Sequence, residues 1–88
     1  MGARDIYGRY RHLLFELATH GPANPDWPRA LDDIVGNFRV ETAPLDKVSA
    51  ALLREELCEQ LEFSANAATN AVARRVLCAA LKKIELIS

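Results

Sequence analysis

The stretch that decides the fold is residues 45–86, LDKVSAALLREELCEQLEFSANAATNAVARRVLCAALKKIEL, which contains no glycine and no proline. An uninterrupted helix over this stretch would be about 60 Å long at 1.5 Å per residue, whereas a compact chain of this length has a radius of gyration near 12 Å. A chain of 88 residues is long enough to fold as one domain, and such a rod would leave it extended. The fold therefore depends on whether this stretch breaks.

The polar segment SANAATN, residues 64–70, is where we expect a kink or a tight turn. Serine, asparagine and threonine side chains compete with the helical backbone through hydrogen bonds of their own, although the alanines between them favour a helix. A continuous coiled coil is excluded. The heptad-like line of residues that starts at Val48 and Leu52 continues into glutamates, and a coiled-coil interface would not bury these without partners: Glu55, Glu59 and Glu62. The residues of this helix that we expect to be buried are instead Leu53, Leu57 and Leu61, on another side of it.

Apolar residues at helical spacing define the other helices. Ile6, Tyr10, Leu13 and Leu17 form one stripe that Gly21-Pro22 ends, Trp27, Leu31, Ile34 and Phe38 form a second, and Thr42 and Pro44 mark the next start. The sequence predicts an all-α fold, in which a single helical domain, residues 1–88, is a small bundle of four helices at about 5–20, 26–38, 44–62 and 66–86. One long kinked helix in place of the last two remains the alternative.

Charge and hydropathy restrict the class of protein. Half of the residues are apolar and the formal net charge is −1, so no overall field favours a polyanion. No apolar run approaches the roughly 20 residues needed to cross a bilayer, and the N-terminal residues lack a signal-peptide layout, so we expect no membrane partner and a cytoplasmic location. Residues 44–63 carry a net charge of −3 and residues 64–88 one of +3, which favours packing between them, within one chain or between two.

No group of residues predicts catalysis, a metal site or a cofactor. His12 and His20 are eight residues apart, about 12 Å along a helix, which is too far for one metal ion. Cys58 and Cys78 lack metal-ligand spacing and are expected to be buried, reduced thiols. No phosphate-binding loop or nucleophile elbow is present, so we do not expect an enzyme.

Residues 31–48, LDDIVGNFRVETAPLDKV, resemble the helix-turn-helix of many repressors. Arg39 stands where that motif has a turn glycine, and Val35 stands where it has a small packing residue. The resemblance implies a DNA-binding regulator that uses a degenerate helix-turn-helix at residues 31–53. The residues that would contact nucleic acid are Thr42, Ala43 and Lys47, and the positions that fit the motif are Leu31, Asp32, Asp33, Ile34, Phe38, Val40, Leu45 and Val48.

The hypothesis we favour is a non-catalytic helical protein–protein interaction module that self-associates as a homodimer and acts as a small regulator, adaptor or inhibitor. It rests on the third helix, which presents apolar residues on more than one side, so that one side can fill the bundle while another meets a protein partner. The candidate partner-binding residues are Leu53, Glu56, Leu57, Gln60 and Leu61. The alternative is that these leucines are intramolecular core.

Overall fold

The computed structural model describes residues 2–87, which form helices and connections without any strand. The elements are α1 (Ala3–His20), the short 3-10 helix η1 (Gly21–Ala23), α2 (Trp27–Thr42), α3 (Lys47–Ala67) and α4 (Ala71–Glu85). The all-α prediction and the bundle of four helices are confirmed.

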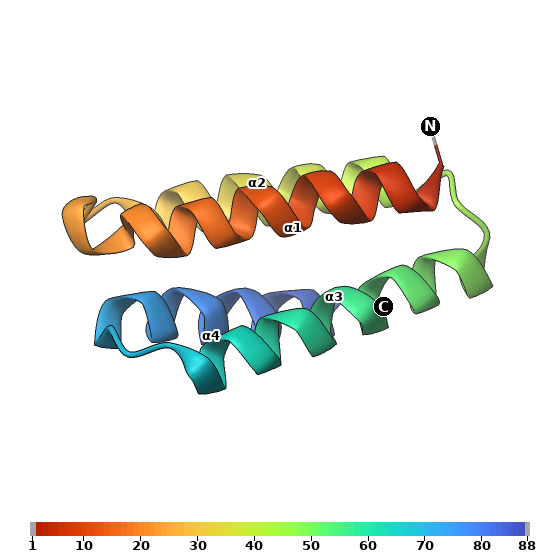
Figure 1. Cartoon of the computed structure of the whole chain (residues 1–88). Coiled ribbons are helices and arrows are strands. Elements are labelled where there is room, and N and C mark those ends of the chain that lie inside the picture. Colours follow the sequence, from red (N-terminus) through yellow and green to blue (C-terminus); the bar gives the residue numbers. More distant parts are fainter. Residues whose placement is uncertain (1, 88) are drawn as a thin grey trace.

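The helices form two antiparallel pairs that lie one on the other (Figure 1). One layer holds α1 and α2, and the other holds the hairpin of α3 and α4. Both α1 and α4 pack against all three other helices, whereas α2 and α3 lie across the bundle from each other. The radius of gyration of the Cα atoms is 12.4 Å, as expected for a compact chain of this length.

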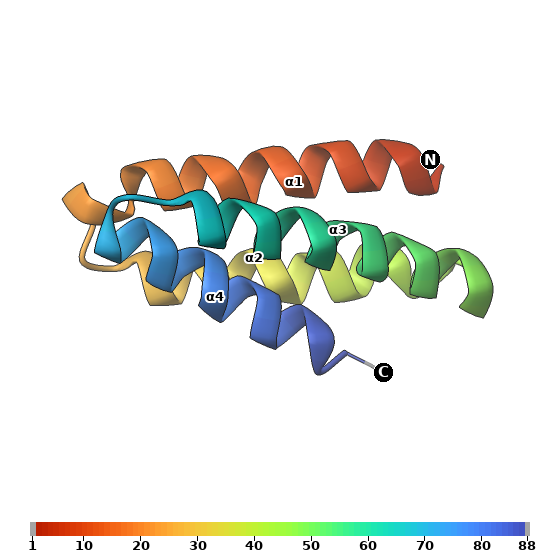
Figure 2. The same ribbon diagram turned by 60° about the horizontal axis from the view of Figure 1, so that its bottom comes forward.

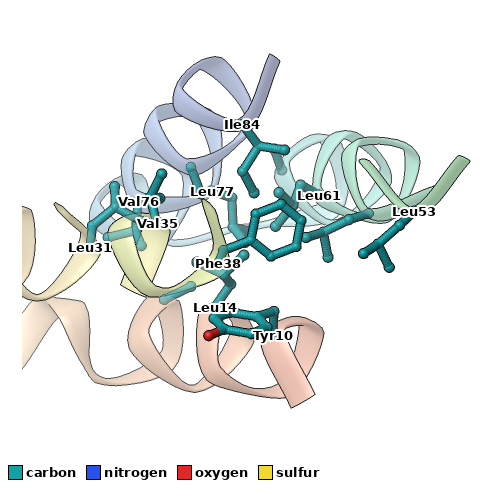
Figure 3. Close-up of a cluster of buried hydrophobic side chains, with 14 of the residues drawn as sticks. Tyr10, Leu14, Leu31, Val35, Phe38, Leu53, Leu61, Val76, Leu77 and Ile84 are labelled. Carbon is teal, nitrogen blue, oxygen red and sulfur yellow. The ribbon is translucent and has the colours of Figure 1, made fainter. Parts of the chain in front are cut away.

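The core lies between the two layers and holds side chains from every helix (Figure 3). Phe38 reaches from α2 toward α1 and the hairpin, and its ring meets the Tyr10 ring edge-on at 5.1 Å between centroids. Each large apolar side chain buried in this way contributes about 1.5–3 kcal/mol. The largest fully buried side chains are Phe38, Leu14, Leu31, Leu57, Leu61, Val76 and Ile84.

Tyr10 also anchors α1 to the end of α2 through its hydroxyl. The hydroxyl donates a hydrogen bond to Oε2 of Glu41, and Nη2 of Arg9 lies 2.7 Å from Oε1 of the same carboxylate. Burial, followed by the bond to Glu41, raises the pKa of Tyr10 to about 12. The phenol therefore remains a neutral donor over the whole physiological range.

The break between α3 and α4 occurs where the polar segment predicts it, but at its C-terminal end. Helix α3 continues through residues 64–67 because Ala65 is buried in the core. Asn70 then caps α4, since its Oδ1 accepts hydrogen bonds from the backbone N–H groups of Val72 at 2.9 Å and Ala73 at 3.1 Å. The two helices form a hairpin within one chain, and the single kinked helix is not observed.

The boundary between α2 and α3 differs from the prediction. Residues 39–42 are helical instead of a connection, and Thr42 is buried with its hydroxyl donating to the Phe38 carbonyl at 2.8 Å. Asp46 is the cap of α3, because its Oδ2 accepts from the Ser49 N–H at 3.0 Å. The hydrogen bonds to Ser49 lower the pKa of this carboxyl, so the cap is charged at neutral pH.

Candidate functional site

The leucines proposed for partner binding lie in the chain's own core. Leu57 and Leu61 have no exposed surface and Leu53 keeps only 4%. Glu56 is exposed and Gln60 is half-buried, so these two remain at the surface of α3. The three leucines therefore cannot form a docking surface in this fold, and the alternative of intramolecular core describes them correctly.

The opposite side of α3 carries the apolar residues that the core leaves out. Val48, Leu52 and Phe63 are 68%, 56% and 73% exposed. Helix α3 does present apolar residues on more than one side, as its sequence indicates, but the roles of the two sides are exchanged. The three leucines named above fill the core, and Val48, Leu52 and Phe63 remain exposed to solvent.

The helix-turn-helix residues do not adopt the geometry of that motif. The motif crosses two helices at a steep angle, whereas α2 and α3 run roughly antiparallel (Figures 1 and 2). Arg39, which takes the place of the turn glycine, lies inside α2. Of the three candidate contacts, Ala43 and Lys47 are exposed and Thr42 is buried. Thr42 therefore cannot contact a nucleic acid in this structure.

The histidines and cysteines do not take part in a metal-binding group within residues 2–87. Within residues 2–87, no group of three or more histidine, cysteine or acidic side chains is placed to hold a metal ion. His12 lies 3.2 Å from Glu16 on the same face of α1. Cys58 is half-buried, and burial together with the charge of Glu85 raises its pKa to about 11. Cys78 is exposed, which corrects the expectation that both thiols are buried.

An open groove lies at the end of the bundle where α4 stops. Helix α4 ends at Glu85, beside Arg54 and Cys58 of α3, while α3 begins two turns farther along at Lys47 (Figure 2). The space that α4 leaves, here called the open-end groove, has a volume of about 910 Å³. It is lined by α2, the first half of α3, the last turn of α4 and the residues after α4, including Val35, Gly36, Arg39, Lys47, Ala50, Ala51, Arg54, Lys83, Leu86 and Ile87.

The open-end groove is lined by both charged and apolar residues. Its charged residues are Arg39, Lys47, Arg54 and Lys83 against Asp32, and Nζ of Lys83 lies 2.6 Å from Oδ1 of Asp32. Leu86, which lines it, is 80% exposed. A helix is about 10–12 Å wide, so the volume is that of about two helical turns. Sequence reasoning missed this groove, because the predicted ranges, 44–62 and 66–86, give the last two helices nearly equal lengths, whereas α3 is longer than α4 in the structure.

An acidic hollow of about 500 Å³ lies directly beside the open-end groove. It runs between α3 and the end of α4, and it shares Arg54 and Ile87 with the groove. Its acidic residues are Glu55, Glu59, Glu62 and Glu85. The ion pairs of residues 2–87 are Arg9–Glu41, His12–Glu16 and Lys83–Asp32, so none joins acidic α3 to basic α4. The opposite charges of α3 and α4 accompany the most extensive packing between any two helices of residues 2–87, but without a direct ion pair between them.

Among residues 2–87, no helix combines the length and the apolar character needed to traverse a bilayer. Comparisons with protein-family models, with curated proteins and with solved structures found no match to this chain. What the chain does is therefore inferred from its own geometry and charge.

Proposed function

We propose that the chain is a non-catalytic helical interaction module that binds a helix of another chain in the open-end groove. As a small regulator, adaptor or inhibitor it would act in the cytoplasm, and self-association into a homodimer is the form of binding that we favour. The observation that carries this proposal is the groove of about 910 Å³ between α2, the first half of α3 and the end of α4, which the exposed Leu86 lines.

Association at this position has an energetic reason. Leu86 is 80% exposed at the groove, and full burial of a leucine side chain contributes about 1.5–3 kcal/mol. A bundle of this size also buries a smaller fraction of its surface than a larger domain does, so association with a second copy adds buried apolar area. Basic residues that line the groove, among them Arg39 and Lys47, favour an acidic helix.

Nucleic acid is the second candidate ligand, because Arg39, Lys47 and Arg54 surround one groove. The neighbouring glutamates Glu55 and Glu59 would repel the phosphates of a duplex laid across it. Fluorescence anisotropy with a labelled duplex at low salt tests this candidate. Binding that weakens steeply as salt rises and is lost in Lys47→Glu would favour it over a protein helix.

Two exposed glycines provide a matched test of the proposed function. Gly36 lines the open-end groove and Gly8 lies on α1, and in both the space around an added Cβ is empty. Tryptophan at either position is compatible with the fold and removes a glycine from a helix interior. Only Gly36→Trp puts a bulky side chain at the groove.

Light scattering after size exclusion measures the outcome. We expect the wild type and Gly8→Trp to have about twice the chain mass of 9.8 kDa, and Gly36→Trp to have the mass of one chain. A wild type that stays monomeric at every concentration would contradict the proposal. So would two glycine variants that both remain dimeric.

A further inference from the structure

A stripe of α3 residues runs along the border of both hollows and is symmetric about its own centre. Lys47, Ala51 and Arg54 line the open-end groove, and Arg54, Glu55, Cys58 and Glu62 line the acidic hollow. Ala51 and Lys47 stand three and seven residues before Arg54, and Cys58 and Glu62 stand three and seven residues after Glu55. Spacings of three and seven keep these residues on one side of a helix.

The charges of this stripe reverse at its centre. The half before the centre holds Lys47 and Arg54, and the half after it holds Glu55 and Glu62, with the small side chains of Ala51 and Cys58 between the charges. Within the described part of the chain, residues 2–87, none of these four charged groups forms an ion pair. Such a stripe is complementary to itself when a second copy is turned end for end.

We infer that two copies of the chain pair through antiparallel α3 helices, related by a two-fold axis between Arg54 and Glu55. This pairing rests on the proposed self-association and names the occupant of the open-end groove. It places Lys47 opposite Glu62 of the partner subunit and Arg54 opposite Glu55 of the partner subunit. Ala51 then faces Cys58 of the partner subunit, where two small side chains allow the helices to approach closely. Each contact occurs twice, as in any two-fold interface.

The same two-fold axis brings part of the second copy to the groove. Helix α4 packs against α3 and ends beside Arg54 and Cys58, and the groove lies beside the first half of α3. A two-fold axis at the middle of α3 exchanges its two halves, so the last turns of the partner's α4 lie over the groove. The exposed Leu86 side chains meet near the axis and become covered.

Charge favours a second copy over an unrelated acidic helix. The groove holds four basic residues and one acidic residue, and the adjoining hollow holds four acidic residues and one basic residue, with Arg54 counted in both. The two surfaces are therefore of equal and opposite charge and lie side by side. A foreign acidic helix would neutralise the groove and leave the hollow unpaired, whereas a second copy pairs each charge of the α3 stripe with its opposite in the same stripe.

Disulfide trapping tests the register. In a Cys78→Ser background, Ala51→Cys places a thiol opposite Cys58 of the partner subunit, and copper-catalysed oxidation is expected to convert most of the protein into covalent dimer. Within one chain the two residues are about 10 Å apart along α3, which is too far for a disulfide. Glu56→Cys in the same background is the matched control, because residue 56 is exposed on α3 but lies off the stripe. It is expected to yield little covalent dimer.

Charge exchange tests the contacts. Lys47→Glu and Glu62→Lys each place like charges opposite each other twice, so each is expected to raise the dimer dissociation constant about tenfold or more. Both changes suit the ends of an isolated helix, so loss of dimer would not reflect loss of fold. The double variant is expected to restore the dissociation constant to within about threefold of the wild type.

The outcomes separate this pairing from the proposed function. One outcome would overturn the antiparallel pairing alone. In it, Gly36→Trp dissociates the dimer, but Ala51→Cys forms no cross-link and the double charge exchange does not restore the dissociation constant. Equal cross-linking through Glu56→Cys overturns it as well. A wild type that never exceeds the mass of one chain overturns the proposed function itself, and the pairing with it.

Discussion

Replacing Asn70 with alanine tests whether the cap of α4 holds the turn between α3 and α4. The Asn70 side chain accepts hydrogen bonds from Val72 N–H at 2.9 Å and Ala73 N–H at 3.1 Å, and alanine leaves both donors to water. Loss of such a cap costs about 1 kcal/mol, within a range of roughly 0.5–2 kcal/mol. For a domain of this size, 1 kcal/mol lowers Tm by about 4–8 °C.

The free energy of unfolding is measured by urea titration with far-ultraviolet circular dichroism. Asn66→Ala is the matched control, since Asn66 is exposed inside α3 and alanine is the better helix former there. We expect Asn66→Ala to be neutral or slightly stabilising, and Asn70→Asp to remain close to the wild type because it keeps the acceptor. Equal stabilities of Asn70→Ala and Asn66→Ala would refute the role of the cap.

Two further predictions follow from perturbed ionisations. The pKa of Tyr10 is raised to about 12 against the ordinary 10.0, so its contribution to stability is complete below pH 10 and is lost as pH rises toward 12. The free energy of unfolding, measured with urea at pH 8 and at pH 11, should therefore fall less for Tyr10→Phe than for the wild type. Equal losses would contradict this. The pKa of about 11 for Cys58, against the ordinary 9.0, lowers its thiolate fraction at pH 8 about a hundredfold, so mass spectrometry should find the exposed Cys78 alkylated first by iodoacetamide and the half-buried Cys58 much more slowly. Alkylation of both thiols at similar rates in the folded protein would show that burial does not protect Cys58.

The helices themselves could be predicted because each carries one apolar stripe. The break after α3 could also be predicted, since residues 64–70 concentrate side chains that compete with the backbone. Its position could not, because the burial of Ala65 holds residues 64–67 in the helix. The start of α3 was misplaced for a similar reason. Thr42 and Asp46 are both acceptable caps, and only the packing of Thr42 into the core decides between them.

The candidate site was less predictable than the fold, for reasons of relative position. Leu57 and Leu52 are equally apolar, and the side of α3 that faces α1 and α4 decides which of them is buried. The open-end groove depends on where α4 stops beside α3, which no local pattern specifies. The glutamates Glu55 and Glu62 are visible in the sequence as a line, but their place beside a basic groove appears only in the folded chain.

The most direct test of the account asks whether a second copy covers the open-end groove. Isotope-filtered nuclear Overhauser spectra of a mixture of labelled and unlabelled chains report only contacts between copies. We expect contacts from the Leu86 methyl groups of one copy to Ala51 of the other, and none to the exposed Leu52. Contacts between copies that instead gather at Leu52 and Phe63, or their absence in a sample with the mass of a dimer, would contradict the account.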